Sequence, residues 1–310
     1  MAPHGNARTD ARLVTLDGRI IGAMRILAGL LWLANLEWKR PPNFGRDLNN
    51  GLYKYVDSAV RLPVFDPFAW VVEHIVLENY TLFGWYTLVA DSTIAALLLL
   101  GLFTRFAALW GAFTSVTIFL SILHYDKAYE WPWSYYLMFA LHLMLFATAA
   151  GQYMGLDGAR AKGRAALERF MWWLGMVAIV VGVAGLIAAR DLGLTARQGA
   201  RLGWGDGELK LLWFNPFSAL LTVVFGALVI AGPRIHRYAV YVAAGGFAVM
   251  ALQVLAQWRD VGGNKTGGIL GGTTPNFAFW GMLAVGVFVC ARQAAKRPDL
   301  VVDEPVVVNF

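Results

Sequence analysis

Three ionisable residues lie inside long apolar stretches of the sequence: Arg25, Asp91 and His142. Near the centre of a bilayer such a group costs about 2.5 kcal/mol or more, so each needs a partner or a function. Arg25 and Asp91 are expected to form an ion pair if their two stretches pack as neighbouring antiparallel helices. That pair has two interpretations, a structural link within the bundle or a group that takes part in proton or quinone chemistry.

His142 has two interpretations, a buried histidine hydrogen-bonded to a Ser or Tyr, or a proton relay and quinone-carbonyl donor that titrates near neutral pH. His124 lies at the outer end of its own apolar stretch, at a different depth. Because a bis-imidazole haem needs two histidines facing each other at one depth, we predict no haem. The single cysteine, Cys290, provides no CxxC pair, so no iron–sulfur cluster or other metal site is predicted.

Polar and aromatic residues also gather where apolar stretches begin and end, and we expect them to form one rim. Aromatic walls and one or two hydrogen-bond donors suit a quinone ring and its oxygens, although Trp and Tyr also mark any membrane interface. Protons would be delivered by His124 or Glu37. The predicted quinone-binding residues are Trp38, Lys39, Tyr125, Trp131 and Trp133.

The composition predicts a polytopic, all-α membrane protein. The chain is 58% hydrophobic and only 15% charged, and several apolar runs are about 20 residues long, enough to span a bilayer. Because backbone polar groups cannot face lipid unpaired, each span should be a helix. The proposed spans are residues 19–38, 81–101, 105–124, 133–150, 170–189, 216–232, 237–257 and 276–293.

The charged residues predict orientation rather than nucleic-acid binding. The net charge of +6 comes from Lys and Arg in loops between apolar spans, where they act as topology determinants. An even number of spans puts both termini on one side, and most loop acids fall on the other. We therefore predict a protein of the cytoplasmic membrane with both termini in the cytoplasm. Residues 52–60 and 66–76 are predicted to form amphipathic helices on the outer surface.

The last four spans repeat the rhythm of the first four. In each half a long loop is followed by two spans joined by a tight basic turn, then a second loop and a last span. This pattern predicts two four-helix units, residues 1–166 and residues 167–310, the second ending in a cytoplasmic tail. The second unit has no acid equivalent to Asp91, so we interpret it as a degenerate, structural half.

Short motifs in the first half resemble the DoxX/DoxD family of membrane proteins. The turn Gly101-Leu-Phe-Thr-Arg105 matches the family's turn between its second and third spans. The exit from the fourth span matches at Gly151, Leu156 and Asp157, and the first span matches at Arg25, Gly29 and Lys39. The resemblance covers residues 18–160 and implies a four-helix membrane unit. DoxD proteins are associated with thiosulfate:quinone oxidoreductases.

The resemblance therefore implies the membrane subunit of a quinone-linked oxidoreductase, embedded in the lipid bilayer and working with a protein partner. The electron donor would be thiosulfate or a related sulfur compound. One alternative is a non-catalytic accessory or assembly subunit of a respiratory or photosynthetic complex. The other is a transporter, which the repeat and the Arg25–Asp91 pair would favour but which the lack of a central Pro in the spans disfavours.

Overall fold

The computed structural model describes residues 7–124, 133–194, 200–202, 211–256 and 270–296, and this part of the chain is almost entirely helical. The long helices are α1 (Ala7–Ala34), α4 (Tyr80–Leu100), α5 (Thr104–Ile122), α6 (Trp133–Ala147), α8 (Arg164–Ala188), α9 (Pro216–Ile235), α10 (Arg237–Ala256) and α11 (Thr274–Lys296). The short ones are η1 (Arg46–Leu48), α2 (Gly51–Arg61), α3 (Asp66–Val71), η2 (Val72–Leu77), η3 (Ala150–Gln152) and α7 (Leu156–Lys162). Strands β1 (Ala200–Leu202) and β2 (Leu212–Phe214) pair antiparallel.

The prediction of an all-α polytopic fold is confirmed. Six of the described helices are long and apolar enough to cross a membrane: α4, α5, α8, α9, α10 and α11. The two other predicted spans also fall on helices. However, α6 has only 15 residues, and α1 carries several charged residues along its 28, so membrane crossing by these two stays a prediction.

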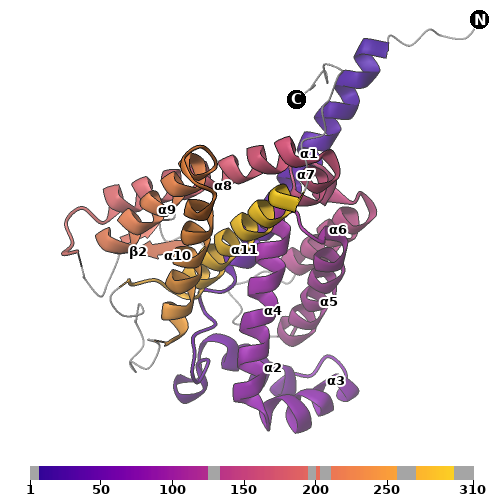
Figure 1. Ribbon diagram of the computed structural model, residues 1–310. Helices are drawn as coiled ribbons and strands as arrows, with labels where there is room; N and C mark the ends of the chain where they lie inside the picture. Colours follow the sequence, from indigo (N-terminus) through magenta and orange to yellow (C-terminus); the bar gives the residue numbers. More distant parts are fainter. Residues whose placement is uncertain (1–6, 125–132, 195–199, 203–210, 257–269, 297–310) are drawn as a thin grey trace, which may run out of the picture.

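The helices of each half pack mainly on one another. In the first half α1 packs on α4 and α5 packs on α6, and a tight turn joins α4 to α5. In the second half α8, α9, α10 and α11 pack in that order, and α11 also packs on α8. Figure 1 shows α11 running between the helices of the second half and α4. The two halves therefore share an interface on α11, whereas the internal repeat and the boundary at residue 166 stay predictions.

Glycines bring helices α8 and α9 close together. A Cβ at Gly175 would lie 2.9 Å from the carbonyl oxygen of Gly226, and one at Gly226 would lie 2.8 Å from that of Gly175. Such reciprocal small-residue contacts are typical of membrane helices, whose association depends on close backbone packing. Helices α8 and α9 of the second half are thus in close backbone contact.

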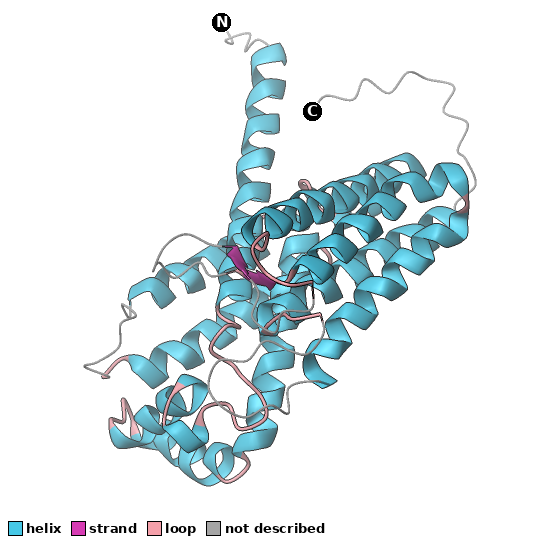
Figure 2. Cartoon of the chain, turned by 90° about the vertical axis from the view of Figure 1, so that its left-hand side faces the viewer, coloured by secondary structure: helices cyan, strands magenta, loops and turns pink. Residues whose placement is uncertain are grey.

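The segment between α1 and α4 folds as the amphipathic pattern predicts. Helix α2 buries Leu52, Val56 and Ala59, and the hydroxyl of Ser58 donates a 2.8 Å hydrogen bond to the Ser121 carbonyl of α5. Helices α2 and α3 lie together at one end of the molecule (Figure 1), which we call the α2–α3 end. The small β1–β2 sheet is seen from a second direction in Figure 2. Helix α2 therefore packs against the end of α5.

Candidate functional site

A buried ion pair joins the segment after α1 to the middle of α4. Lys39 Nζ contacts Asp91 Oδ2, and the side chains of the two residues are only 1% and 0% exposed. Helix α1 ends at Ala34, four residues before the predicted end of the first span, and a series of tight turns follows. These turns bring Lys39 back against α4, so its ammonium group points into the bundle instead of out toward water.

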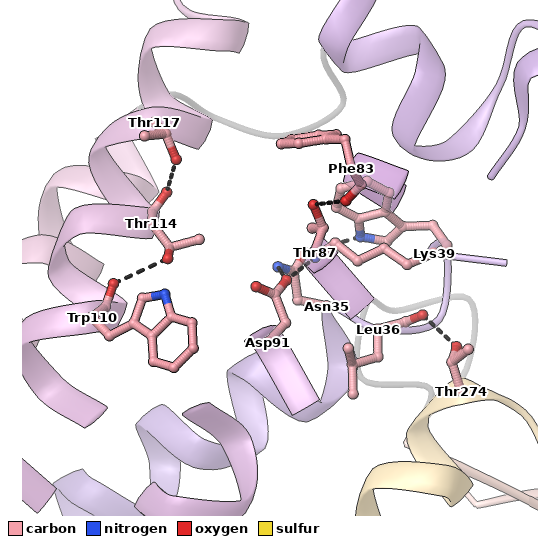
Figure 3. A network of polar contacts seen from close by, with 11 residues as sticks. Asn35, Leu36, Lys39, Phe83, Thr87, Asp91, Trp110, Thr114, Thr117 and Thr274 are labelled. Carbon is pink, nitrogen blue, oxygen red and sulfur yellow. Dashed lines mark hydrogen bonds and ion pairs between the residues drawn. The ribbon is translucent and has the colours of Figure 1, made fainter. Parts of the chain in front are cut away.

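Two further side chains complete the environment of the pair. Asn35 Nδ2 donates to Asp91 Oδ2 at 3.4 Å, and Trp38 Nε1 donates to Asn35 Oδ1 at 3.0 Å. Lys39 Nζ also lies 4.4 Å from the centre of the Trp38 ring, a cation–π distance. Asn35 and Lys39 therefore contact Asp91 directly from one short segment (Figure 3), and Trp38 of the same segment contacts both of them.

One oxygen of the Lys39–Asp91 pair lacks a hydrogen bond, and this makes the pair a candidate for chemistry. Asp91 Oδ1 is buried and has no hydrogen-bond partner among the described residues. An ionised carboxylate can accept several hydrogen bonds, and a buried polar atom without one is costly. Figure 3 shows one Asp91 oxygen directed toward Lys39 and the other toward the side of α5 that carries Trp110. Asp91 Oδ1 is thus an unsatisfied acceptor enclosed within the protein.

The predicted Arg25–Asp91 ion pair is wrong. Arg25 instead donates to three backbone carbonyls: Leu98, Leu99 at 3.0 Å and Met154 at 3.0 Å. Leu98 lies seven residues beyond Asp91 on α4, which corresponds to about 10 Å along the helix, more than an arginine side chain bridges here. Arg25 adds a donor to carbonyls in the last turn of α4, where the helix runs out of intrahelical partners and the Gly101 amide also donates to Leu98 at 3.1 Å.

Two of the sequence motifs of the first half, the Gly101–Arg105 turn and the segment that ends at Asp157, contact each other at one end of the bundle. Asp157 Oδ1 accepts from the Phe103 amide at 3.1 Å, and Asp157 Oδ2 accepts from the amide and hydroxyl of Thr104 at 3.2 and 3.3 Å. The Asp157 amide in turn donates to the Gly101 carbonyl at 2.9 Å. Asp157 therefore caps the first turn of α5 from a distant segment, a structural role typical of an acid at a helix N-terminus.

Gly101 makes this arrangement possible. Its φ of 65° is left-handed, and a Cβ there would lie 2.9 Å from the Arg25 guanidinium and 2.6 Å from the Gly155 Cα. A larger residue would be strained in this conformation and would collide with both neighbours. Arg25, the Gly101 turn and Asp157 form one structural cluster, separated along α4 from the Lys39–Asp91 pair.

His142 is a satisfied core histidine. Its Nε2 accepts from Trp32 Nε1 at 2.9 Å, and its Nδ1 donates to the Met138 carbonyl at 2.6 Å. The partners are thus a tryptophan and the backbone, not the Ser or Tyr that we expected. Because both ring nitrogens are engaged and the residue is 0% exposed, His142 has no free donor for a quinone carbonyl.

The residues that we predicted to form one rim lie in different surroundings. His124 is exposed, and its Nδ1 lies 3.1 Å from the Pro63 carbonyl, whereas Lys39 is engaged by Asp91. Glu37 is half-buried and Trp133 is 51% exposed. Tyr125 and Trp131 lie outside the described residues. The structure therefore brings Trp38 and Lys39 together around Asp91 but places His124 against the α2–α3 connection.

The Lys39–Asp91 contact was missed from the sequence although both residues had been singled out. A lysine at the end of a membrane helix normally extends toward water, and this expectation placed Lys39 on the rim. The available signal was the short spacing from Asn35 to Lys39, two polar residues that follow the apolar part of α1 and that both contact Asp91 in the structure. Within the described ranges, no group of three or more His, Cys, Asp or Glu could hold a metal ion.

A family model described as the TQO small subunit DoxD matches residues 21–187, more than half of the chain. The matched range contains Arg25, Lys39, Asp91, Gly101 and Asp157, and it extends past residue 160 through nearly all of α8. No curated protein and no solved structure matches the chain.

Proposed function

We propose, from the premise that this chain belongs to the DoxD family, that it is the membrane subunit of a quinone-linked oxidoreductase. The family description names a small subunit of TQO, which we take as thiosulfate:quinone oxidoreductase. Thiosulfate or a related sulfur compound would supply two electrons, and quinone would take up those electrons with two protons to give hydroquinone. A small subunit implies a partner subunit, which we propose as the site of sulfur-compound oxidation.

The observation that carries this proposal is the Lys39–Asp91 pair. A quinone is confined to the apolar part of the bilayer, so its protons must be handled by groups inside the membrane protein. A buried acid–base pair is expensive in such surroundings, and intramembrane ionisable residues are by default candidates for proton transfer. Asp91 supplies an ionisable carboxylate within a helix that is long and apolar enough to span the membrane.

The predicted roles of the rim residues change accordingly. Lys39 and Trp38 contribute as the partner and the neighbouring ring of the Asp91 site, rather than as free quinone ligands. His124 and Glu37 are proposed to carry protons between this site and the surface, because His124 is exposed beside Pro63 of the α2–α3 connection and Glu37 lies in the short segment that contacts Asp91. The α2–α3 end would face outward, with both termini on the cytoplasmic side of the cytoplasmic membrane.

Thiosulfate-dependent quinone reduction in host membranes tests the proposal. We expect this activity to disappear when the gene is deleted and to return when the full chain is supplied in trans. Membranes supplied with an Asp66→Asn chain, which changes an exposed acid at the α2–α3 end, serve as the control and should be fully active. Unchanged activity in the deletion strain would overturn the proposal and favour an assembly role in another complex.

A further inference from the structure

A pocket opens on the surface at the end of the bundle opposite the α2–α3 end. Its volume of about 540 Å³ lies within the range of about 300–1,000 Å³ that is typical of small-molecule sites. Figure 1 shows α7 at this end, where α1 projects from the bundle. Two segments far apart in the sequence line the pocket, one with Phe103, Thr104, Arg105 and Phe106, the other with Ala149, Gln152 and Asp157.

Two polar side chains of the pocket have no partner in the fold. Arg105 and Gln152 are exposed, and neither side chain makes a hydrogen bond or an ion pair within the described part of the chain. The guanidinium group offers five N–H donors in a planar fork that matches phosphate oxygens, and the carboxamide offers two more. A base in the first turn of a helix also interacts unfavourably with the helix dipole, so the stability of α5 does not explain Arg105.

The acid of the pocket is already engaged by the fold. Asp157 accepts from the Phe103 amide and from the amide and hydroxyl of Thr104. Arg25 interacts electrostatically with the same carboxylate, and Arg160 lies over the Phe103 ring with its guanidinium carbon 5.6 Å from the ring centre. The charge of Asp157 is therefore offset within the protein, whereas the charge of Arg105 is left for a ligand.

The pocket lies where a membrane-spanning helix begins. Arg105 is in the first turn of α5, which is long and apolar enough to cross a membrane, and this position corresponds to the level of the lipid headgroups. Phe106, Leu109 and Phe113 follow at spacings of three and four residues and are 57%, 56% and 64% exposed. These spacings place them on one face of α5, so an apolar stripe runs from the pocket along the helix.

We infer that this pocket binds the headgroup of an anionic phospholipid, with Arg105 and Gln152 donating to the phosphate oxygens. One acyl chain of that lipid lies along the stripe of Phe106, Leu109 and Phe113. Basic pockets at the cytoplasmic ends of membrane helices are suited to such headgroups. The site is independent of the proposed redox function, and the proposed orientation places it in the cytoplasmic leaflet.

Lipid binding to the purified full chain tests this site. The chain is stripped of lipid in a neutral detergent and titrated with phosphatidylglycerol or with phosphatidylcholine of the same acyl chains, and bound lipid is counted by native mass spectrometry. We expect phosphatidylglycerol to bind at least about fivefold more tightly, because the choline ammonium group of the other lipid would lie beside Arg105. Equal affinities for the two lipids would overturn the inference.

Three variants separate the pocket from the overall charge of the chain. Arg105→Gln removes an exposed charge without a partner and should weaken phosphatidylglycerol binding at least about fivefold, with phosphatidylcholine binding unchanged. Gln152→Glu adds a carboxylate to the pocket and should weaken phosphatidylglycerol binding similarly. Lys162→Gln is the matched control, because Lys162 is an exposed base of α7 that does not line the pocket, and it should bind as the wild type does.

Equal losses in Arg105→Gln and Lys162→Gln would overturn the inference, because the lipid would then respond only to net charge. Unfolding temperatures measured without lipid should match the wild type in all three variants, which separates lost binding from lost folding. Glycerol 3-phosphate, which carries the phosphate without acyl chains, should not displace the lipid at equal concentration. Displacement at equal concentration would assign the pocket to a soluble phosphate compound and overturn the lipid assignment.

Discussion

Thr274 of α11 donates a 2.5 Å hydrogen bond to the carbonyl of Leu36, three residues before Lys39. Both residues are 0% exposed, and Leu36 lies within the segment that supplies Asn35, Trp38 and Lys39 to the Asp91 site. The second half of the chain thus holds the turn that positions the ion pair (Figure 3). A half that we interpreted as degenerate therefore has a direct structural connection to the candidate site.

Replacing Thr274 tests this connection. Thr274→Val keeps the shape of the side chain but removes one of the two donors to the buried Leu36 carbonyl, which still accepts from the Lys39 amide at 3.1 Å. The loss of this one hydrogen bond should cost about 0.5–1.5 kcal/mol. Thr274→Ser keeps the hydroxyl and should recover most of that loss. Thermal unfolding of the purified chain in detergent measures both variants, and equal stability of the Val and Ser variants would show that the hydrogen bond contributes nothing.

The Lys39–Asp91 pair should show strong coupling. Asp91→Asn or Lys39→Met alone leaves one buried charge without its counter-charge and should destabilise the fold by about 3–5 kcal/mol. The double variant removes both charges and should be much closer to the wild type than the two single effects predict when added. A double-mutant cycle on unfolding midpoints measures the coupling, and purely additive effects would contradict a direct interaction.

Asp157 should stabilise the start of α5. Asp157→Ala removes the acceptor for the Phe103 and Thr104 amides and should cost about 0.5–2 kcal/mol, the usual range for a lost helix cap. Glu73→Ala, at an acid whose side chain is 58% exposed, is the matched control and should be nearly neutral. Hydrogen exchange of the amides in the first turn of α5 should rise in the Asp157 variant; unaltered exchange there would argue against capping.

Arg25 should not tolerate lysine. One planar guanidinium reaches carbonyls on α4 and on the segment before α7, whereas an ammonium group on a flexible chain cannot hold the same three acceptors in that geometry. Arg25→Lys should therefore lower the unfolding temperature, while Arg19→Lys, at an exposed position of the same helix, should not. Equal effects of the two substitutions would contradict the role assigned to Arg25.

The helices were predictable from the sequence because apolar length and the need to pair backbone groups in lipid determine them almost alone. The end of α1 was not, because Leu36 and Trp38 extend the apolar side of the helix pattern although tertiary contacts with Asp91 and Thr274 draw the segment into turns. A four-residue error at that end was enough to move Lys39 from the bundle to the rim.

The polar residues of the site were predictable by type but not by partner. Arg25, Asp91 and His142 stood out because charge is costly in apolar stretches, and all three prove to be fully buried. Their partners depend on the register between helices, which the sequence of each helix does not contain. Arg25 consequently binds the end of α4, His142 binds Trp32, and Asp91 binds a lysine expected at the surface.

The most direct test of the central claim is thiosulfate-dependent quinone reduction in membranes whose only copy of this chain is the double variant Lys39→Met, Asp91→Asn. We expect normal abundance of the protein, because no unpaired charge is buried, together with loss of most of the quinone reduction that the wild-type chain supports. Wild-type activity from a normally abundant double variant would contradict the assignment of the Lys39–Asp91 pair to quinone chemistry.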